Sequence, residues 1–256
     1  MTIIYEERYS ESSYVETVTR GWTVSDGSTI RPAESHWHMV FVKLNSSIRP
    51  LVVGPWTTSG VASWGEGAEI LWIKFKLGTF MPNLPTRDFL ELETILPDAS
   101  SKSFWLNGSA RQFPNYDNVE TFVDWLVRDE VLVRDPIVNA VLQDQLPETS
   151  SRTVRHHFLQ ATGLTQSYIR QFERAQKAAV LLKQGASILD TVYEAGYFDQ
   201  PHLTRSVKQF IGYTPAEIIR MSKPESCHFI QDSDLLLDYD TNVLITQTKG
   251  VYTWEK

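Results

Sequence analysis

Two stretches of the chain concentrate side chains that can hydrogen-bond to a nucleic acid. The first reads SRTVRHHFLQATG and the second reads QPHLTRSVKQFIG. Arginine can pair with guanine through two hydrogen bonds, glutamine can do the same with adenine, and a lysine that contacts phosphate positions the protein without reading sequence. The side chains with this chemistry are Arg152, Arg155 and His156 in the first stretch, and Gln200, His202, Thr204, Arg205 and Lys208 in the second.

The spacing of apolar residues predicts that the second stretch is a helix with these polar side chains on one face. At about 100° per residue, Leu203, Val207 and Phe210 share a sector opposite the polar set. Asp199 is a suitable N-cap, and Pro201 falls in the first turn, where a missing N–H costs little. The helix therefore has one face for packing and one for contact with a partner.

The same plan occurs twice. Upstream of the second stretch, residues 187–195 predict a short helix, and Gly196 predicts a turn with positive φ, which together make a helix-turn-helix unit. Upstream of the first stretch, residues 136–146 predict the partner helix, and Phe158 faces inward. Residues 165–185 predict a long helix between the units. A basic amphipathic helix is usually only a solvated surface helix, but two such units in one region favour contact with DNA.

Charge is distributed unevenly along the chain. The net charge is −7. Residues 150–223 hold ten Lys and Arg against five Asp and Glu, a balance of +5, so the remainder carries −12. This asymmetry predicts two parts with different partners.

The C-terminal part resembles the AraC/XylS family of bacterial transcription regulators over roughly residues 135–220. The shared residues are the Ser-Ile-x-Asp stretch at 187–190, Gly196-Tyr197, Asp199-Gln200, His202-Leu203, Arg205, Gly212 and Thr214-Pro215. The resemblance implies a domain of about seven helices whose two recognition helices enter adjacent major grooves of double-stranded DNA. It implies base contacts by Arg152, Arg155, His156, Gln200, His202, Thr204 and Arg205, with Lys208 on phosphate.

The N-terminal part predicts a β-rich barrel or sandwich, which makes the fold class α+β. The runs HMVFVKL, LVVGPW and EILWIKFKLG are rich in Val and aromatic residues and are punctuated by Gly and Pro. We expect a sensor domain at 1–115, a connecting helix at 116–134 and a DNA-binding domain at 135–222. Residues 223–256 form an acidic extension, with strands expected to dock on the sensor domain.

Tryptophans in the sensor region suggest a ligand pocket, because aromatic walls suit apolar or planar molecules. The expected ligand-binding residues are Trp37, His38, Trp56, Trp64 and Trp72. The alternative is that these tryptophans fill a core. His36 and His38 share a strand face, but the following positions that could add a carboxylate hold Val42, Lys43 and Leu44, so we expect no metal and no cofactor.

The sequence carries none of the common catalytic motifs, so we expect no enzymatic activity. With one cysteine, Cys227, no internal disulfide can form, and the N-terminus lacks a signal peptide; both favour the cytoplasm. No apolar run is long enough to cross a membrane. A small-molecule effector, RNA polymerase and a second copy of the chain remain open as partners. Two alternatives also remain open: an enzyme or repair-type protein with a cupin-like metal or Cys227 activity, and a helical module that binds protein.

Overall fold

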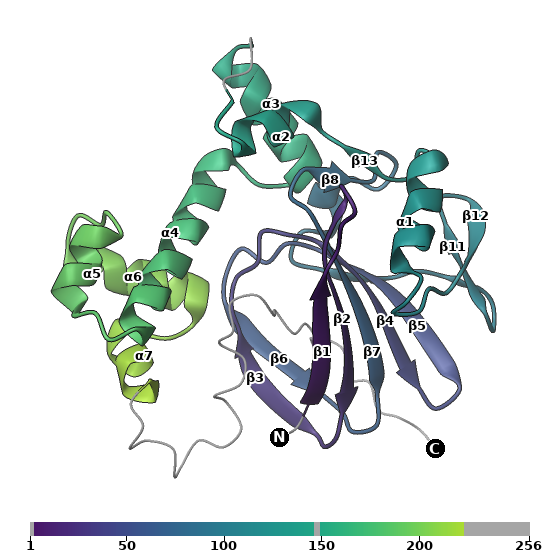
Figure 1. Ribbon diagram of the computed structural model, residues 1–256, viewed down its shortest axis with the longest axis horizontal. Helices are drawn as coiled ribbons and strands as arrows, with labels where there is room; N and C mark the ends of the chain where they lie inside the picture. The colour runs from purple at the N-terminus through teal and green to yellow at the C-terminus, as the bar shows by residue number, and fades with distance from the viewer. Residues whose placement is uncertain (1–2, 146–148, 223–256) are drawn as a thin grey trace.

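A strand-rich region precedes a helical region in the computed structural model, which describes residues 3–145 and 149–222 (Figure 1). The expected α+β order, strands first and helix-turn-helix units second, is confirmed. The expected acidic extension at 223–256, its docking strands and Cys227 lie outside the described residues.

The strand-rich region is built on one six-stranded sheet in which every pairing is antiparallel. Its strands, in spatial order, are β1 (Ile3–Tyr9), β2 (Val15–Thr23), β7 (Glu69–Phe75), β4 (His38–Leu44), β5 (Ser47–Val53) and β9 (Glu93–Ile95). Smaller antiparallel sheets pair β3 (Gly27–Arg31) with β6 (Gly60–Trp64), and β8 (Thr79–Phe80) with β13 (Val133–Arg134). The last joins β10 (Asp98–Ser100), β11 (Ser103–Leu106) and β12 (Ser109–Gln112).

The six-stranded sheet packs against an apolar cluster on each face, as the alternating side chains of β7 show. Leu71 and Ile73 lie in one apolar cluster, whereas Ile70 and Trp72 lie in another, since successive side chains of a strand point to opposite faces. The first cluster is covered by α1 (Val119–Arg128), whose apolar residues belong to it. Trp72, which the alternation set apart from Leu71, therefore packs in the second cluster.

The helical region holds the remaining helices among the described residues. They are α2 (Pro136–Leu142), α3 (Ser151–Thr162), α4 (Gln166–Lys183), α5 (Ile188–Glu194), α6 (Gln200–Ile211) and α7 (Pro215–Met221), and a 3₁₀ turn, η1 (Thr86–Phe89), lies in the strand-rich region. In Figure 1, α4 runs from α2 and α3 at one end to α5, α6 and α7 at the other. None of the helices described in residues 3–145 and 149–222 is long and apolar enough to span a membrane.

Candidate nucleic-acid interface

Helix α6 forms as the sequence predicts, because both of its ends carry the expected signals. The Asp199 carboxylate accepts the N–H of His202 at 2.7 Å, and Gly212 ends the helix in the left-handed region with φ +90°. Leu203, Val207, Phe210 and Ile211 are buried. The predicted inward face is therefore confirmed, and it fixes which face is left for a partner.

The outward face of α6 presents most of the predicted contact residues. Gln200, Arg205 and Lys208 are exposed, while His202 and Thr204 are half-buried. The His202 ring stands edge-on to the Tyr197 ring, with centroids 5.1 Å apart. The Lys208 ammonium lies 3.6 Å from a Glu217 carboxylate oxygen. Arg205 is thus the least constrained cation on this face, whereas Lys208 has a partner on its own domain.

Helix α3 presents the other predicted set. The Ser150 hydroxyl accepts the N–H of Thr153 at 3.2 Å and caps the helix, and Phe158, Ala161 and Thr162 are buried. All three predicted contact residues on this helix are exposed: Arg152, Arg155 and His156. The neighbouring His157 has a structural role instead, since its Nδ1 lies 2.6 Å from the Asp135 carboxylate that caps α2.

Helix α4 separates α3 from α6 and buries one apolar side of six residues (Figure 1). Two of its basic residues brace the second unit. Arg174 lies over the Tyr197 ring at 5.0 Å, and the Lys177 ammonium donates to the Glu194 carbonyl at 2.9 Å. Arg174 and Lys177 therefore make contacts within the helix-turn-helix domain, so the number of basic residues in the sequence overstates the positive charge that faces a partner.

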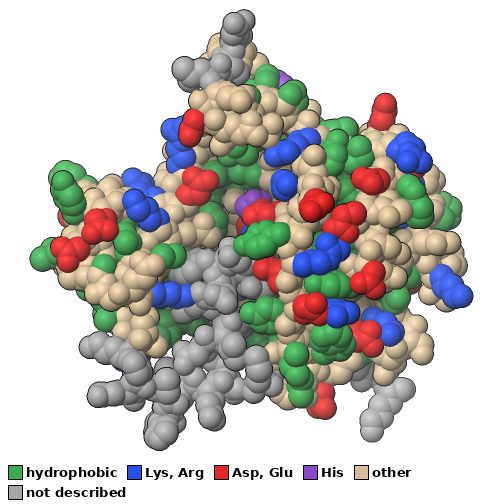
Figure 2. Space-filling model, viewed as in Figure 1, with side chains coloured by type: hydrophobic (Ala, Val, Ile, Leu, Met, Phe, Trp, Pro, Cys, Tyr) green, Lys and Arg blue, Asp and Glu red, His purple; other side chains and the backbone are tan. Residues whose placement is uncertain are grey.

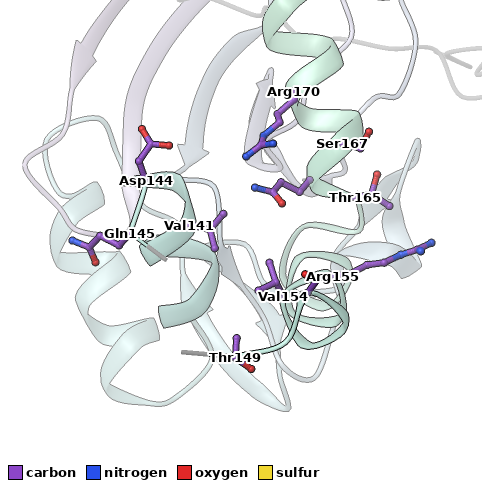
Figure 3. Close-up of a pocket in the computed structure, with 11 residues that line it drawn as sticks. Val141, Asp144, Gln145, Thr149, Val154, Arg155, Thr165, Ser167 and Arg170 are labelled. Atoms are coloured by element: carbon purple, nitrogen blue, oxygen red, sulfur yellow. The ribbon is translucent and has the colours of Figure 1, made fainter. Parts of the chain in front are cut away.

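A cavity of about 610 Å³ lies between α2, α3 and the start of α4 (Figure 3). Arg155 and Arg170 both line it, together with Gln166 and Ser167 from the first turn of α4. In Figure 3, Arg155 extends away from the helices that surround the cavity. The sequence did not single out Arg170, Gln166 or Ser167 as cavity residues. Thr165, which caps α4 by accepting the N–H of Tyr168 at 3.2 Å, marks in the sequence where the first turn of that helix begins.

This geometry agrees with a comparison to known protein families. A family model described as a helix-turn-helix domain matches residues 148–221. Residues 148–221 are a helix-turn-helix domain of the AraC type. The match covers most of the region predicted at 135–222 but begins after α2, and the strand-rich region lies outside it.

Comparison with solved structures gives a weaker likeness to the whole chain. ToxT from Vibrio cholerae is 11% identical, with 86% of this chain and 98% of that chain covered at a TM-score of 0.34. ToxT from Vibrio cholerae O395 is 10% identical, with 87% and 99% covered at a TM-score of 0.37. These scores are too low to carry an argument about ligands or mechanism. Among curated proteins, no relative matches the chain.

The strand-rich region binds the C-terminal end of the second recognition helix of the helix-turn-helix domain. The N–H of Ala33 donates to the Phe210 carbonyl at 2.7 Å, and the N–H of Ser59 donates to the Gln209 carbonyl at 2.8 Å. A Cβ placed on Gly212 would lie only 2.3 Å from Ile30 Cγ2, so the two regions are in close contact there.

The first recognition helix is bound in the same way at its own C-terminal end. The Thr86 hydroxyl of η1 donates to the Ala161 carbonyl at 3.1 Å, and a Cβ on Gly163 would lie 3.3 Å from the Arg87 nitrogen. Between the two units, the Tyr168 hydroxyl of α4 donates to the Thr57 carbonyl. The strand-rich region therefore contacts the helix-turn-helix domain at both units, while the exposed arginines of each unit lie nearer the other end of their helix.

An apolar patch on the helix-turn-helix domain was not anticipated from the sequence. Leu189 and Tyr193 on α5 and Phe198 in the following turn are 72%, 88% and 90% exposed. Apolar side chains stand at the left edge of the helical lobe in Figure 2, where Figure 1 places α5, whereas acidic and basic side chains are interspersed over the strands.

The five expected ligand-binding residues do not share one cluster. Trp37 lies in the first apolar cluster, stacked on Phe75 with centroids 4.0 Å apart, and its indole N–H donates to the Thr79 carbonyl at 2.6 Å. Trp64 and Trp72 lie in the second cluster, with Trp56 packed against it. His38 is buried at the start of β4.

Charged groups lie buried beside these aromatic residues. His36 has one ring nitrogen 2.7 Å from the Glu34 carboxylate and the other 3.0 Å from Glu16, so it donates to both when protonated. The Lys74 ammonium lies 3.8 Å from each carboxylate. Burial lowers the pKa of His36, but the two carboxylates outweigh it and raise the pKa overall. No group of three or more His, Cys, Asp and Glu suited to a metal occurs within residues 3–145 and 149–222.

The pKa values of the two carboxylates in this cluster are lowered, whereas burial alone would raise them. Burial raises the pKa of Glu16, but the hydrogen bond from His36 and the charges of His36 and Lys74 bring it down to about 2. Glu34 also ends with a pKa well below its usual value, despite burial, because of Lys74 and His36. His38 is different, since burial lowers its pKa to about 3 and keeps it neutral.

Proposed function

We propose that this protein is a sequence-specific DNA-binding transcription regulator of the AraC/XylS type. The observation that carries the proposal is the pair of recognition helices with outward cationic faces, α3 and α6, held apart by α4 in a helix-turn-helix domain. Helices of this size fit the major groove, and arginine and glutamine there can read guanine and adenine. In this proposal the chain catalyses no reaction and acts in the cytoplasm.

Base reading is assigned to the residues that the sequence singled out. Arg152, Arg155 and His156 would read one major groove, and Gln200, His202, Thr204 and Arg205 would read the next. Lys208 would contact a backbone phosphate, exchanging its pairing with Glu217 for one of the closely spaced negative charges of the duplex. The exposure of Arg152, Arg155, Gln200 and Arg205 supports this assignment.

Control would come through the strand-rich region, by a small-molecule effector or a partner. The contacts of Ser59 and Thr86 with the ends of α6 and α3 support this mechanism, because a shift of either contact changes how the recognition helices are placed. An effector that binds one arrangement better than another would shift the population competent to bind DNA. RNA polymerase and a second copy of the chain are the further partners in this proposal.

The effector site is proposed at His38, Trp56, Trp64 and Trp72, with Trp37 supporting the opposite face of the sheet. His38 Nδ1 and the indole N–H groups of Trp56 and Trp64 are buried without a hydrogen-bond partner in the described residues, which favours a ligand that carries acceptors. A link to DNA binding is provided by Arg31, which lies over the Trp56 ring at 4.1 Å and donates to the Thr58 carbonyl at 3.3 Å, next to Ser59.

The decisive experiment is selection of bound duplexes from a random pool with the full-length protein. Enrichment of one sequence with two half-sites about one helical turn apart is expected. A pool that stays random while binding persists would contradict sequence-specific recognition. A thermal-shift screen of small molecules against the same protein would then test for an effector.

A further inference from the structure

A cleft opens on the first face of the six-stranded sheet, beside the residues that lead into α1. Its volume is about 320 Å³, which is within the range of small-molecule sites. Phe41 and Leu71 line its buried part, and Ile48 lies with them. Trp22 and Tyr116 supply aromatic walls from segments far apart in the sequence. The lining is therefore largely apolar, and three of its members, Trp22, Phe41 and Tyr116, are flat rings.

Arg20 connects the two aromatic walls. Its guanidinium carbon lies 5.6 Å from the Trp22 ring centroid and 4.5 Å from the Tyr116 ring centroid. Trp22 is 40% exposed, so one ring of the pair remains open to solvent. Arg8 lies over the Tyr116 ring as well, 5.1 Å from its centroid, so guanidinium contacts hold both rings in place and the cleft keeps its shape without a ligand.

The cations beside the cleft already have partners. Arg20 lies 2.6 Å from Glu6, and the Lys43 ammonium lies 3.0 Å from Glu69. Because each positive charge is matched by a carboxylate, the lining offers no net charge to a ligand. A charged molecule would have to break one of these pairs, so the cleft favours an uncharged one.

One polar group of the residues that line the cleft lacks a partner among the described residues. The Tyr116 hydroxyl is buried and makes no hydrogen bond with any described residue. A buried hydroxyl without a partner is unfavourable, and a ligand with one polar group would satisfy it. Burial raises the pKa of Tyr116, so the hydroxyl keeps its proton and can donate or accept.

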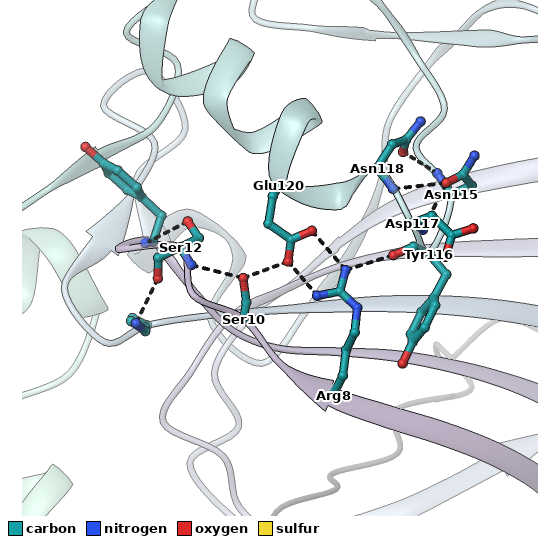
Figure 4. A network of polar contacts seen from close by, with 10 residues as sticks. Arg8, Ser10, Ser12, Asn115, Tyr116, Asp117, Asn118 and Glu120 are labelled. Atoms are coloured by element: carbon teal, nitrogen blue, oxygen red, sulfur yellow. Dashed lines mark hydrogen bonds and ion pairs between the residues drawn. The ribbon is translucent and has the colours of Figure 1, made fainter.

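The position of Tyr116 is fixed by a polar network (Figure 4). Arg8 donates to the Tyr116 carbonyl at 2.9 Å and to both oxygens of Glu120 at 2.6 and 2.9 Å. The Ser10 hydroxyl also donates to Glu120 at 2.8 Å. Glu120 lies in the first turn of α1, so the cleft wall is joined to the helix that leads toward the helix-turn-helix domain.

We propose that this cleft is a small-molecule site for an uncharged, largely apolar, planar compound that carries one hydrogen-bonding group. It is separate from the effector residues proposed above, because Phe41 and Leu71 face the first cluster and Trp64 and Trp72 face the second. The apolar lining of Phe41, Ile48 and Leu71, together with the exposed Trp22, supplies the affinity for a flat molecule, and Tyr116 supplies its orientation.

Two dyes that differ mainly in charge test the proposal. N-phenyl-1-naphthylamine is neutral, and 8-anilino-1-naphthalenesulfonate is its anionic counterpart. In fluorescence titrations of the full-length protein, the neutral dye should saturate at one molecule per chain and bind at least about tenfold more tightly than the anion, a difference of one decade in affinity. Equal affinities, or binding that does not saturate, would overturn the proposal.

Substitutions inside and outside the cleft lining test whether the neutral dye binds in the cleft. Trp22→Ala should weaken binding of the neutral dye at least about tenfold, and Tyr116→Phe about fivefold, as expected for loss of one hydrogen bond. Trp125→Ala is the matched control, because Trp125 is 48% exposed, on α1, and outside the cleft lining. Equal losses in Trp22→Ala and Trp125→Ala would mean nonspecific adsorption and refute the site.

Two further measurements keep these outcomes interpretable. If Trp22→Ala lowers the unfolding temperature, Tyr116→Phe decides, since it retains the ring and removes only the hydroxyl; full dye affinity in that variant would overturn the assigned orientation. Sedimentation of the wild type and of Trp22→Ala tests for a second copy of the chain on this surface. A dimer lost on substitution would assign the cleft to that contact and refute a small-molecule role.

Discussion

Ser59 donates its backbone N–H to the carbonyl oxygen of Gln209, 2.8 Å away, and so joins the strand-rich region to the last turn of α6. Carbonyls in the last turn of a helix have no partner within the helix, and this contact supplies one. Because the donor and acceptor are both backbone groups, no side-chain truncation removes the bond directly. Steric displacement at Gly212 is therefore the sharper test of this junction.

Gly212→Ala should separate the strand-rich region from α6. The new Cβ would lie 2.3 Å from Ile30 Cγ2, and the backbone φ of +90° already disfavours any side chain. We expect a loss of about 2–4 kcal/mol in the free energy of unfolding, from left-handed strain together with overpacking. Urea unfolding at constant pH measures it.

Gly185→Ala is the matched control. Gly185 has almost the same φ, +91°, but a Cβ there meets nothing within 4 Å. This variant should lose only about 1–2 kcal/mol, the strain of the left-handed conformation itself. Equal losses in the two variants would show that the junction at Ile30 contributes nothing.

The helix-turn-helix domain could be predicted from sequence because its signals are local. Asp199 and Gly196 determine a cap and a turn within a few residues of themselves, and both behave as predicted. Asn118 is an instructive exception. It is a residue type that commonly caps helices and it directly precedes α1, but its side chain accepts the N–H of Asn115 at 2.8 Å rather than an N–H of the helix.

Contacts between distant segments could not be predicted in the same way. The bond from Ser59 to Gln209 joins backbone groups about 150 residues apart in the chain, and backbone groups carry no sequence signature. The cleft between Trp22 and Tyr116 likewise depends on which strands become neighbours. Alternation along β7 puts Trp72 and Leu71 on opposite faces, but only the packing of distant segments in the two apolar clusters shows that both faces are covered.

Arg205→Ala should lower affinity for the selected DNA site by about 1–3 kcal/mol and relax the preference at one position, because Arg205 is proposed to pair with a base. Lys208→Ala should instead weaken binding to all sequences by a similar factor. Titrations of both variants on the selected site and on a scrambled duplex distinguish these results. A uniform loss in Arg205→Ala would reassign Arg205 to phosphate contact.

The buried cluster around His36 should make stability depend on pH in a defined window. The pKa of His36 is raised in the folded protein, so its stabilising contribution is complete below the unfolded value of 6.5 and is lost as pH rises through the folded value. His38 makes stability depend on pH on the acidic side instead. Its folded pKa of about 3 means that the unfolded chain takes up the proton first, so stability falls as pH drops below 6.5.

Urea unfolding between pH 5 and pH 9 should therefore show a maximum near neutrality. Glu16, with a folded pKa of about 2, contributes its full stability above its unfolded value of 4.5 and loses it as pH falls toward 2, outside this range. His36→Gln should remove the loss on the alkaline side and leave the loss on the acidic side. An alkaline slope unchanged by His36→Gln would assign that slope to another group.

Salt should weaken DNA binding in proportion to the number of phosphates that the helix-turn-helix domain neutralises. Each neutralised phosphate lowers the logarithm of affinity by about 0.9 per decade of salt, because condensed counterions are released on binding. Lys208→Ala should reduce the magnitude of this slope by about 1, whereas Gln200→Ala, which removes no charge, should leave it unchanged. Binding titrations on one duplex at several salt concentrations measure all three slopes. If the wild-type slope were flat, the cationic faces of α3 and α6 would not be the surface that binds DNA.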